Sequence, residues 1–290
     1  MNRLLPVIAL AVLAYPAAPV SGQSGEENAK PPIFWDGGMI PDPGFRAYVL
    51  ENFDTDRDGK ISSEEADAVL VIDLGREEPT DTPGIKSLEG VEYFKNLREL
   101  IGAFHPLTSL RLSENTALIR LDCHNNRLTA LNLTGNPMLT ELVCSYNLLP
   151  TLDLSENTML TDLWCESNRL TSIDLSQNKA LSRLYCDNNR LTTLDLSANT
   201  ALTGLSCHDN RLTALALSKN TKLVALGCCD NPLIRLNLSN LAKLGAISLD
   251  YDNYKIQVIT NSRTAIVSSL TRYMQSIEAE KQKKHLQQEE

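Results

Sequence analysis

Leucines recur along most of this chain with a period of 21 residues. Residues 97–243 divide into seven consecutive blocks of 21 residues without an insertion, and the shared pattern is LxxLxCxxNxLTxLDLSxNxx. Repeats of about 20 to 29 residues with an L-x-x-L-x-L-x-x-N core are typical of leucine-rich repeats. One coil cannot bury its leucines alone, whereas stacked coils form a continuous apolar column. The pattern therefore predicts a leucine-rich-repeat solenoid.

The two halves of each block, LxxLxCxxN and LxxLxLxxN, look alike but differ in their polar positions. These positions vary from block to block in the cysteine half and are monotonous in the LDLS half. Because variation suits a surface that recognises a ligand, we predict that the cysteine half carries the strands of a curved parallel sheet on the concave face. The strand leucines should then lie above one another, and they are Leu121, Leu142, Leu163, Leu184, Leu205 and Leu226.

An asparagine follows each of these strands at the same spacing. The amides of such a ladder can satisfy backbone groups of the turns that would otherwise be buried without hydrogen bonds. Replacement of an internal asparagine by leucine should therefore destabilise the fold. The ladder consists of Asn126, Asn147, Asn168, Asn189, Asn210 and Asn231.

Both ends of the repeat array need caps, because the outermost coils would otherwise expose apolar surface. We predict a small helical N-terminal cap over 41–75 and a first capping coil over 76–96. Residues 244–290 form the predicted C-terminal cap. Its coil begins at Leu244 and carries Leu249 where a cysteine would stand, and a closing strand over 251–259 and a helix over 264–286 follow.

The first 22 residues have the pattern of an export signal. Arg3 provides a positive start, an apolar stretch interrupted by Pro6 and Pro16 follows, and small residues lead to Ser21 and Gly22. The stretch is shorter and more interrupted than the about 20 apolar residues that a transmembrane helix needs. We therefore expect a signal peptide over 1–22, a flexible linker over 23–40 and no transmembrane anchor.

Six of the seven cysteines recur every 21 residues at a core position. Stacked strands lie about 4.7–4.9 Å apart with parallel side chains, whereas a disulfide needs converging Cβ atoms nearer about 3.8 Å. We therefore predict buried free thiols that act as small apolar groups. Cys229 directly follows Cys228 and should face the opposite way, onto the concave face. The six stacked cysteines are Cys123, Cys144, Cys165, Cys186, Cys207 and Cys228.

An acidic loop precedes the repeats. Residues 54–65 read DTDRDGKISSEE and match the calcium loop of an EF-hand, with Gly59 at the sharp turn and Ile61 at the apolar position after it. Helical patterns flank the loop over 45–53 and 62–70. A single loop predicts a structural calcium ion that stiffens the cap. The predicted ligands are Asp54, Asp56, Asp58, the carbonyl of Lys60, Ser62 and Glu65.

The outward positions of the predicted strands form columns of residues 21 apart, and aromatic residues gather on the middle coils. Exposed Trp and Tyr are frequent anchors of interfaces and can also stack on sugar rings, so the ligand could be a protein or a glycan. A mere cover of the strand surface is the alternative. The predicted ligand-binding residues are Trp164, Tyr185, Tyr146, Phe104, Asp122, Asp187, His208 and Cys229.

One column, Asp187, His208 and Cys229, could form a nucleophilic triad or hold a transition metal. An open sheet offers no evident oxyanion donors, however, and the sequence lacks HExxH, GxSxG and phosphate-loop patterns. We therefore expect a binding protein rather than an enzyme. The net charge of −9 argues against a nucleic acid as partner, because neutralisation of phosphates provides most of that affinity.

The 21-residue repeat with a stacked cysteine resembles the internalin-like leucine-rich-repeat proteins of bacteria that carry a cysteine ladder. The resemblance covers residues 97–243 and implies a role in adhesion or in binding a protein or glycan of a host. We expect a monomeric recognition protein that is secreted or lies at the cell surface. The alternative is a periplasmic or envelope scaffold that binds the cell's own components.

Overall fold

The computed structural model describes residues 40–75, 84–249 and 257–260, and all of them belong to one compact unit of the chain. The predicted signal peptide over 1–22, the linker up to residue 39 and the helix over 264–286 lie outside the described residues. Among the helices that the structure does describe, none is long and apolar enough to span a membrane.

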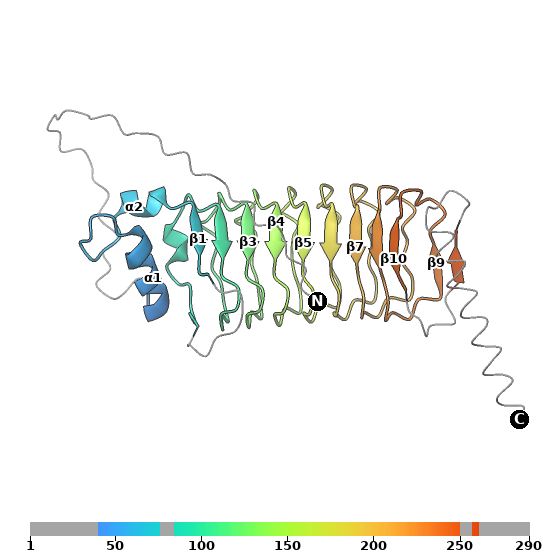
Figure 1. The fold of residues 1–290 in the computed structure, drawn as a ribbon, viewed down its shortest axis with the longest axis horizontal. Coiled ribbons are helices and arrows are strands. Elements are labelled where there is room, and N and C mark those ends of the chain that lie inside the picture. The colour runs from blue at the N-terminus through green and yellow to red at the C-terminus, as the bar shows by residue number, and fades with distance from the viewer. Residues whose placement is uncertain (1–39, 76–83, 250–256, 261–290) are drawn as a thin grey trace, which may run out of the picture. The chain divides into compact units, whose positions relative to one another are not determined.

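The described repeats form a solenoid whose strands make one parallel nine-stranded sheet (Figure 1). Each strand is three residues long and pairs in register with the strand one coil away, so that Leu142 lies beside Leu121 and Leu163. The predicted leucine-rich-repeat fold is confirmed. The strands are β1 Val71–Asp73, β2 Glu99–Ile101, β3 Arg120–Asp122, β4 Glu141–Val143, β5 Asp162–Trp164, β6 Arg183–Tyr185, β7 Gly204–Ser206, β8 Ala225–Gly227 and β10 Ala246–Ser248.

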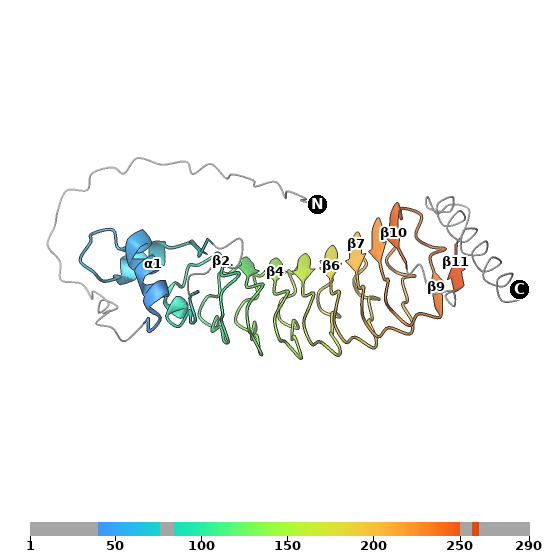
Figure 2. The same cartoon turned by 60° about the horizontal axis from the view of Figure 1, so that its bottom comes forward.

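All strands from β2 to β8 lie in the cysteine half of their blocks, as the variable positions predict. A second, two-stranded parallel sheet consists of β9 Arg235–Asn237 and β11 Gln257–Ile259. It lies in the LDLS half, since β9 is continuous with the preceding coil through a bridge between Leu215 and Leu236. The described end of the predicted closing strand thus extends this second sheet and not the main one (Figure 2).

Leucines and cysteines fill the space between the two halves of each coil. The ladder leucines and all six stacked cysteines are buried, and these cysteines form no disulfide with one another. Burial raises the pKa of the thiols of Cys144, Cys165 and Cys186 well above its ordinary value. These thiols therefore remain protonated and behave as small apolar side chains.

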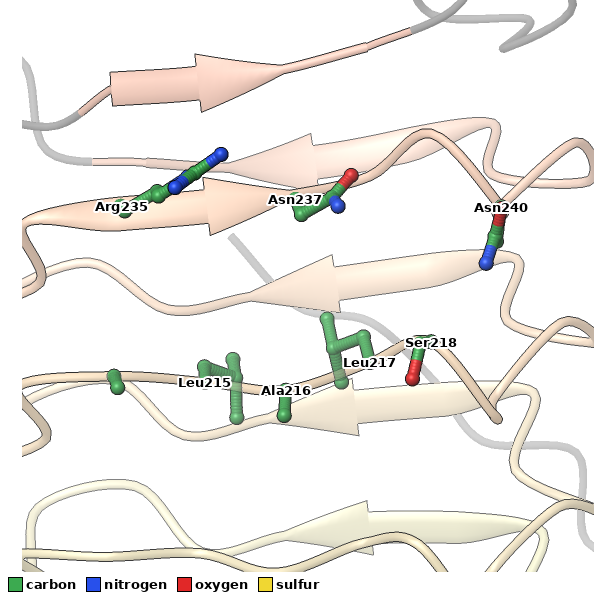
Figure 3. Close-up of a pocket in the computed structure, with 8 residues that line it drawn as sticks. Leu215, Ala216, Leu217, Ser218, Arg235, Asn237 and Asn240 are labelled. Carbon is green, nitrogen blue, oxygen red and sulfur yellow. The ribbon is translucent and has the colours of Figure 1, made fainter.

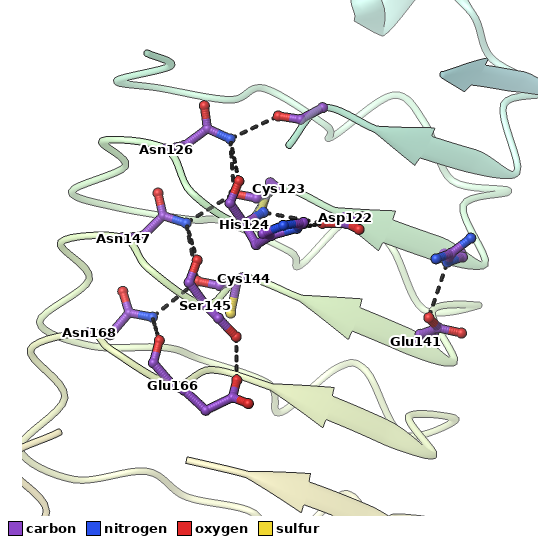
Figure 4. A network of polar contacts seen from close by, with 12 residues as sticks. Asp122, Cys123, His124, Asn126, Glu141, Cys144, Ser145, Asn147, Glu166 and Asn168 are labelled. Atoms are coloured by element: carbon purple, nitrogen blue, oxygen red, sulfur yellow. Dashed lines mark hydrogen bonds and ion pairs between the residues drawn. The ribbon is translucent and has the colours of Figure 1, made fainter. Parts of the chain in front are cut away.

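The first asparagine ladder, defined by the six asparagines predicted above, connects each coil to the one before it. In Asn168, Nδ2 donates to the carbonyls of Cys144 at 3.0 Å and Cys165 at 3.2 Å, and Oδ1 accepts from the N–H of Leu149 at 3.1 Å. The pattern repeats at Asn147 (Figure 4). Both ends of each amide are therefore used, which confirms the predicted role.

A second asparagine ladder lies in the LDLS half. In Asn157, Nδ2 donates to the carbonyls of Leu133 at 3.1 Å and Asn136 at 2.9 Å. The Oδ1 atoms of this ladder are buried and have no hydrogen-bond donor within the described part of the chain. Only the first ladder satisfies donors and acceptors alike. The second ladder consists of Asn115, Asn136, Asn157, Asn178, Asn199 and Asn220.

Two helices cover the β1 end of the sheet: α1 Pro43–Phe53 and α2 Ser63–Ala68. Asp42 caps α1 through Oδ1, and its Oδ2 accepts from the backbone N–H of Lys86 at 2.7 Å. The hydroxyl of Tyr48 on α1 accepts from the N–H of Asp73 at 3.1 Å. A 3₁₀ helix, Val91–Tyr93, completes the first coil. The cap therefore protects the edge of β1 from pairing with other chains.

We expect the variant Asn168→Leu to lose about 2–3 kcal/mol of unfolding free energy. The leucine adds apolar surface but leaves the buried N–H of Leu149 without its acceptor, at a cost of about 1–3 kcal/mol. The carbonyls of Cys144 and Cys165 lose one donor each and keep their bonds to Asn147 and Asn189. Urea denaturation measures the loss, with Thr171→Ala, an exposed position on the same coil, as the control. Equal midpoints for Asn168→Leu and the parent would contradict the role of the ladder.

Candidate functional site

The strand side of the solenoid presents four rows of side chains, which together we call the outer face; it is the predicted concave face. The charged row precedes the ladder leucines and contains Glu99, Arg120, Glu141, Asp162 and Arg183. The aromatic row follows them and contains Ile101, Asp122, Val143, Trp164, Tyr185, Ser206 and Gly227. The polar row contains Ala103, His124, Ser145, Glu166, Asp187, His208 and Cys229. The turn row contains Phe104, Asn125, Tyr146, Ser167, Asn188, Asp209 and Asp230.

The charged row is a feature that the sequence analysis did not single out. Arg120 lies between two acids, with Nη1 3.8 Å from Glu99 and Nε 3.1 Å from Glu141. Arg183 pairs with Asp162 on the neighbouring strand. Opposite charges at positions 21 apart, one residue before a ladder leucine, are a signal that could have identified this row.

The aromatic row brings Trp164 and Tyr185 together on the neighbouring strands β5 and β6. Their rings are nearly parallel, with an interplanar angle of 8° and centroids 5.6 Å apart. The guanidinium of Arg183 lies 5.2 Å from the centroid of the Trp164 ring, a cation–π geometry. Both rings are half-buried. The stack is thus held in place on both strands and keeps part of its surface accessible.

Asp122 is a correction to the prediction of a ligand-binding residue. Only 8% of it is exposed, because the ring of His124 covers it and places Nδ1 2.5 Å from Oδ1. The ring of Phe104 meets that of His124 edge to face at 4.8 Å. Asp122 therefore positions His124 and is not itself available to a ligand.

In the middle of the polar row, two acids lie on neighbouring coils. Glu166 accepts a hydrogen bond from the hydroxyl of Ser145 (Figure 4). Burial raises the pKa of Glu166, the charge of Asp187 raises it further, and the bond from Ser145 and the charge of His124 oppose this rise. Asp187 accepts from the hydroxyl of Ser206 at 2.7 Å and from the N–H of His208 at 2.6 Å.

The column of Asp187, His208 and Cys229 does not assemble a triad. Asp187 contacts the backbone N–H of His208 and not its ring. The ring accepts at Nδ1 from the backbone N–H of Cys229 at 2.9 Å, and the Cys229 thiol lies 3.0 Å from the hydroxyl of Ser248. His208 therefore fills the space above Gly227, where a Cβ would overlap its Nε2. The arrangement is a packing interaction rather than a path for a proton.

Every residue of the turn row has a positive φ, between 49° and 58°. Asn and Asp tolerate this left-handed conformation, whereas it strains an aromatic residue. Tyr146, with φ 55°, is nevertheless in this conformation and is 56% exposed. It lies on the coil before Trp164, so an exposed aromatic side chain extends the aromatic surface toward the turns.

The acidic loop adopts part of the local geometry that its sequence predicts. Oxygens of Asp54, Asp56 and Asp58 lie within 4.8 Å of one another. Asp54 Oδ2 accepts from the N–H of Gly59 at 2.9 Å, and Asp54 Oδ1 is buried without a hydrogen-bond partner among the described residues. Gly59 has φ +81°, which glycine adopts without strain, and Ile61 is fully buried.

Glu65 lies outside this group of carboxylates. Its Oε1 accepts from the N–H and hydroxyl of Thr55 at 2.7 Å, and its Oε2 accepts from the N–H and hydroxyl of Ser62 at 2.9 Å. Burial alone would raise the pKa of Glu65, but these bonds outweigh burial and lower it from 4.5 to about 2. The stabilisation is thus fully present above pH 4.5 and is lost as the pH falls toward 2.

Two hollows lie away from the outer face. One, of about 310 Å³, lies in the LDLS half between the coil of Leu215–Ser218 and the residues Arg235, Asn237 and Asn240 (Figure 3). Here Ala216 occupies the position that acids such as Asp195 hold in earlier coils. The other, of about 420 Å³, is bounded by the acidic loop and residues 68–71. Neither hollow contains a residue of the Trp164–Tyr185 stack.

Comparison with solved structures finds other leucine-rich-repeat proteins. No family model and no curated protein matches this chain. The functional domain of InlJ from Listeria monocytogenes, which includes a cysteine ladder, is 27% identical over 79% of this chain and 63% of its own length, with a TM-score of 0.45. Internalin C2 from the same organism is 20% identical over 74% of this chain and 96% of its own, with a TM-score of 0.49.

A third match is the leucine-rich-repeat ectodomain of the plant membrane receptor kinase GASSHO1/SCHENGEN3 from Arabidopsis thaliana, in complex with CASPARIAN STRIP INTEGRITY FACTOR 2. It is 21% identical over 67% of this chain and 27% of its own length, with a TM-score of 0.58. The likeness shows a shared leucine-rich-repeat architecture. This chain spans only about 63% of the InlJ domain.

We expect Gly227→Ala to destabilise the outer face, because its Cβ would displace the His208 ring and break the bond to the N–H of Cys229. The expected loss is about 1 kcal/mol of unfolding free energy. Gly204→Ala is the matched control, since its Cβ would lie 3.9 Å from Arg183 and 4.0 Å from Tyr185, and it should change stability by less than about 0.5 kcal/mol. Denaturation curves that shift equally for both variants would refute the packing role of His208.

Proposed function

We propose that this protein is a recognition protein that binds a protein ligand through the outer face of its sheet. The observation that carries the proposal is the stack of Trp164 on Tyr185, with the exposed ring of Tyr146 on the preceding coil. Aromatic residues that are held in place lose little conformational entropy on binding and dominate many interfaces. The solenoid supplies a rigid surface on which neighbouring coils can contact neighbouring residues of the ligand.

A protein ligand fits the outer face better than a glycan does. Sugar rings need an accessible aromatic face, and Tyr185 and the guanidinium of Arg183 cover part of the Trp164 ring. The charged row offers paired charges that can exchange partners with a protein surface. The plant ectodomain described above is likewise in complex with a partner, CASPARIAN STRIP INTEGRITY FACTOR 2.

We propose binding rather than catalysis, because Asp187, His208 and Cys229 make no connected chain of side chains in the described residues. The signal pattern of residues 1–22 supports a protein that is secreted or exposed at the surface, with the periplasm as the other destination of an exported chain. A host protein is the ligand that fits an exported recognition protein, and a component of the cell's own envelope is the alternative that the same experiment tests.

The double variant Trp164→Ala/Tyr185→Ala should bind the ligand about thirtyfold more weakly, as expected for loss of about 2 kcal/mol at an interface anchor. Purified protein is used to capture partners from separate fractions of host surface proteins, bacterial envelope proteins and glycans, and each captured partner is then titrated directly. Thr192→Ala/Thr213→Ala, two exposed positions outside the outer face, is the control. A partner that binds the aromatic variant as tightly as the parent would refute the proposed surface, and a glycan would replace the protein ligand.

We also propose that the acidic loop holds one structural calcium ion. Asp54, Asp56 and Asp58 provide a converging set of hard oxygen ligands, which Ca²⁺ prefers. The buried Oδ1 of Asp54 has no other partner in the described residues. The carbonyl of Lys60, the hydroxyl of Ser62 through a water molecule and the carboxylate of Glu65 complete the expected set. Glu65 exchanges its bonds to Thr55 and Ser62 for the ion.

Calcium should raise the melting temperature of the cap. At about one hundred times Kd, an ion that binds only the folded state adds about 2.7 kcal/mol. The variant Asp56→Asn/Asp58→Asn should lose this increase, whereas Glu51→Gln/Asp67→Asn, two exposed acids outside the loop, should retain it. Calorimetry with calcium and with a chelator makes the comparison. An unchanged melting curve of the parent in chelator would exclude a structural calcium ion.

A further inference from the structure

We infer that the partner of the outer face is a positively charged protein surface, which places an arginine or lysine side chain beside the Trp164–Tyr185 stack. The inference rests on the proposed function and names the chemistry of the ligand. It derives from the unequal charge on the two sides of the stack and from the excess of carboxylates over the whole face.

On the side of the charged row, the chain itself supplies a cation. The guanidinium of Arg183 lies over the Trp164 ring at 5.2 Å and is paired with Asp162. A cation on this ring is therefore stabilised by an aromatic face and a carboxylate together. The arrangement shows which kind of group this part of the outer face accommodates.

On the side of the polar row, the next outward residues of the same two coils are carboxylates, and the one opposite charge that acts on Glu166 is that of His124. Glu166 and Asp187 follow Trp164 and Tyr185 by two residues, about 7 Å along an extended backbone beyond the end of each strand. Within the described residues, neither carboxylate forms an ion pair. A cationic side chain of a partner would pair with these carboxylates, as Arg183 pairs with Asp162 on the other side of the stack.

The two carboxylates are held in place by neutral donors. The hydroxyl of Ser145 donates to Glu166, and the hydroxyl of Ser206 and the N–H of His208 donate to Asp187. These bonds orient the acids without neutralising them, and the charge of Asp187 acts against ionisation of Glu166. An incoming cation relieves this repulsion and finds its acceptors already positioned, which reduces the cost of binding.

The rest of the outer face has the same sign of charge. Its arginines, Arg120 and Arg183, are paired with acids and are outnumbered by the carboxylates. Such an excess steers positively charged partners toward the face and repels acidic ones. Exposed arginines at 127, 169, 190 and 211 lie two residues beyond the turn row and limit the acidic surface on that side. The carboxylates are Glu99, Asp122, Glu141, Asp162, Glu166, Asp187, Asp209 and Asp230.

The test uses two synthetic peptides as probes, one of five Gly-Arg repeats and one of five Gly-Glu repeats. The chain has two tryptophans, so the variant Trp35→Phe leaves Trp164 as the only indole. Its ¹⁵N-labelled indole N–H signal is followed by NMR in the full chain with calcium present. We expect a saturable shift with the Gly-Arg peptide that weakens at high salt, and no shift with the Gly-Glu peptide.

The deciding variant is Glu166→Gln/Asp187→Asn, which removes two charges and keeps oxygen acceptors for Ser145, Ser206 and His208. It should bind the Gly-Arg peptide about tenfold more weakly. The matched control, Asp153→Asn/Asp174→Asn, removes two exposed charges in the LDLS half. In an earlier coil, Asn132 accepts from the N–H of Thr134 in the same way as Asp153 accepts from the N–H of Ser155. An asparagine at these positions should therefore allow normal folding. The control should bind the Gly-Arg peptide within about twofold of the parent.

The outcomes separate this inference from the proposed function. Equal weakening by both double variants, or equal binding of both peptides, would overturn the inference. A captured protein that depends on Trp164 and Tyr185 but binds the Glu166→Gln/Asp187→Asn variant normally would also overturn it and leave the proposed function intact. Specific binding of the Gly-Arg peptide, without any protein partner in the capture experiment, would support the cationic preference and count against the proposed function.

Discussion

The hydrogen bond from each buried asparagine to the backbone of the preceding coil is the interaction on which the rest of the structure depends. Each strand of a 21-residue coil is only three residues long, and the asparagine side chains add to the backbone hydrogen bonds that join the turns of neighbouring coils. The Asn168 amide joins its own coil to the preceding one by donating to Cys144 and Cys165 and accepting from Leu149. Because the same bonds recur at every coil, the turns cannot shift by one residue without leaving buried groups unsatisfied.

This fixed register determines the surface. Three-residue strands that alternate around a buried leucine place every residue of the charged, aromatic and polar rows in line with its counterpart 21 residues away. Trp164 and Tyr185 can therefore stack without any rearrangement of the backbone, and Asp162 meets Arg183 for the same reason. The inner positions are leucine in almost every coil, whereas the outer positions differ from coil to coil. Residues of the outer face can change at little cost in stability.

The periodicity predicted the solenoid, the strand half, the buried thiols and the first asparagine ladder, because each follows from repetition at one spacing. Contacts between unlike residues were harder to predict. Asp122 belongs to an outward row, yet the ring of His124 covers its carboxylate. Its burial therefore depends on the side-chain conformation of His124, which the repeat pattern does not specify. The loop motif brought Asp54, Asp56 and Asp58 together, but it could not reveal the bonds of Glu65 to Thr55 and Ser62. β11 lies beyond the repeat, so its pairing with β9 has no periodic signal.

The register is tested most directly by Cys228 and Cys229, neighbouring residues on opposite sides of the sheet. Alkylation of the native protein, followed by mass spectrometry of its peptides, compares the two thiols under the same conditions. Cys229 is partly exposed, whereas Cys228 and the five cysteines stacked with it are buried. We expect Cys229 to be modified first, and all seven cysteines to be modified only after denaturation. Labelling of Cys228 in the native protein at the rate of Cys229 would contradict the assigned register, and with it the placement of every residue on the outer face.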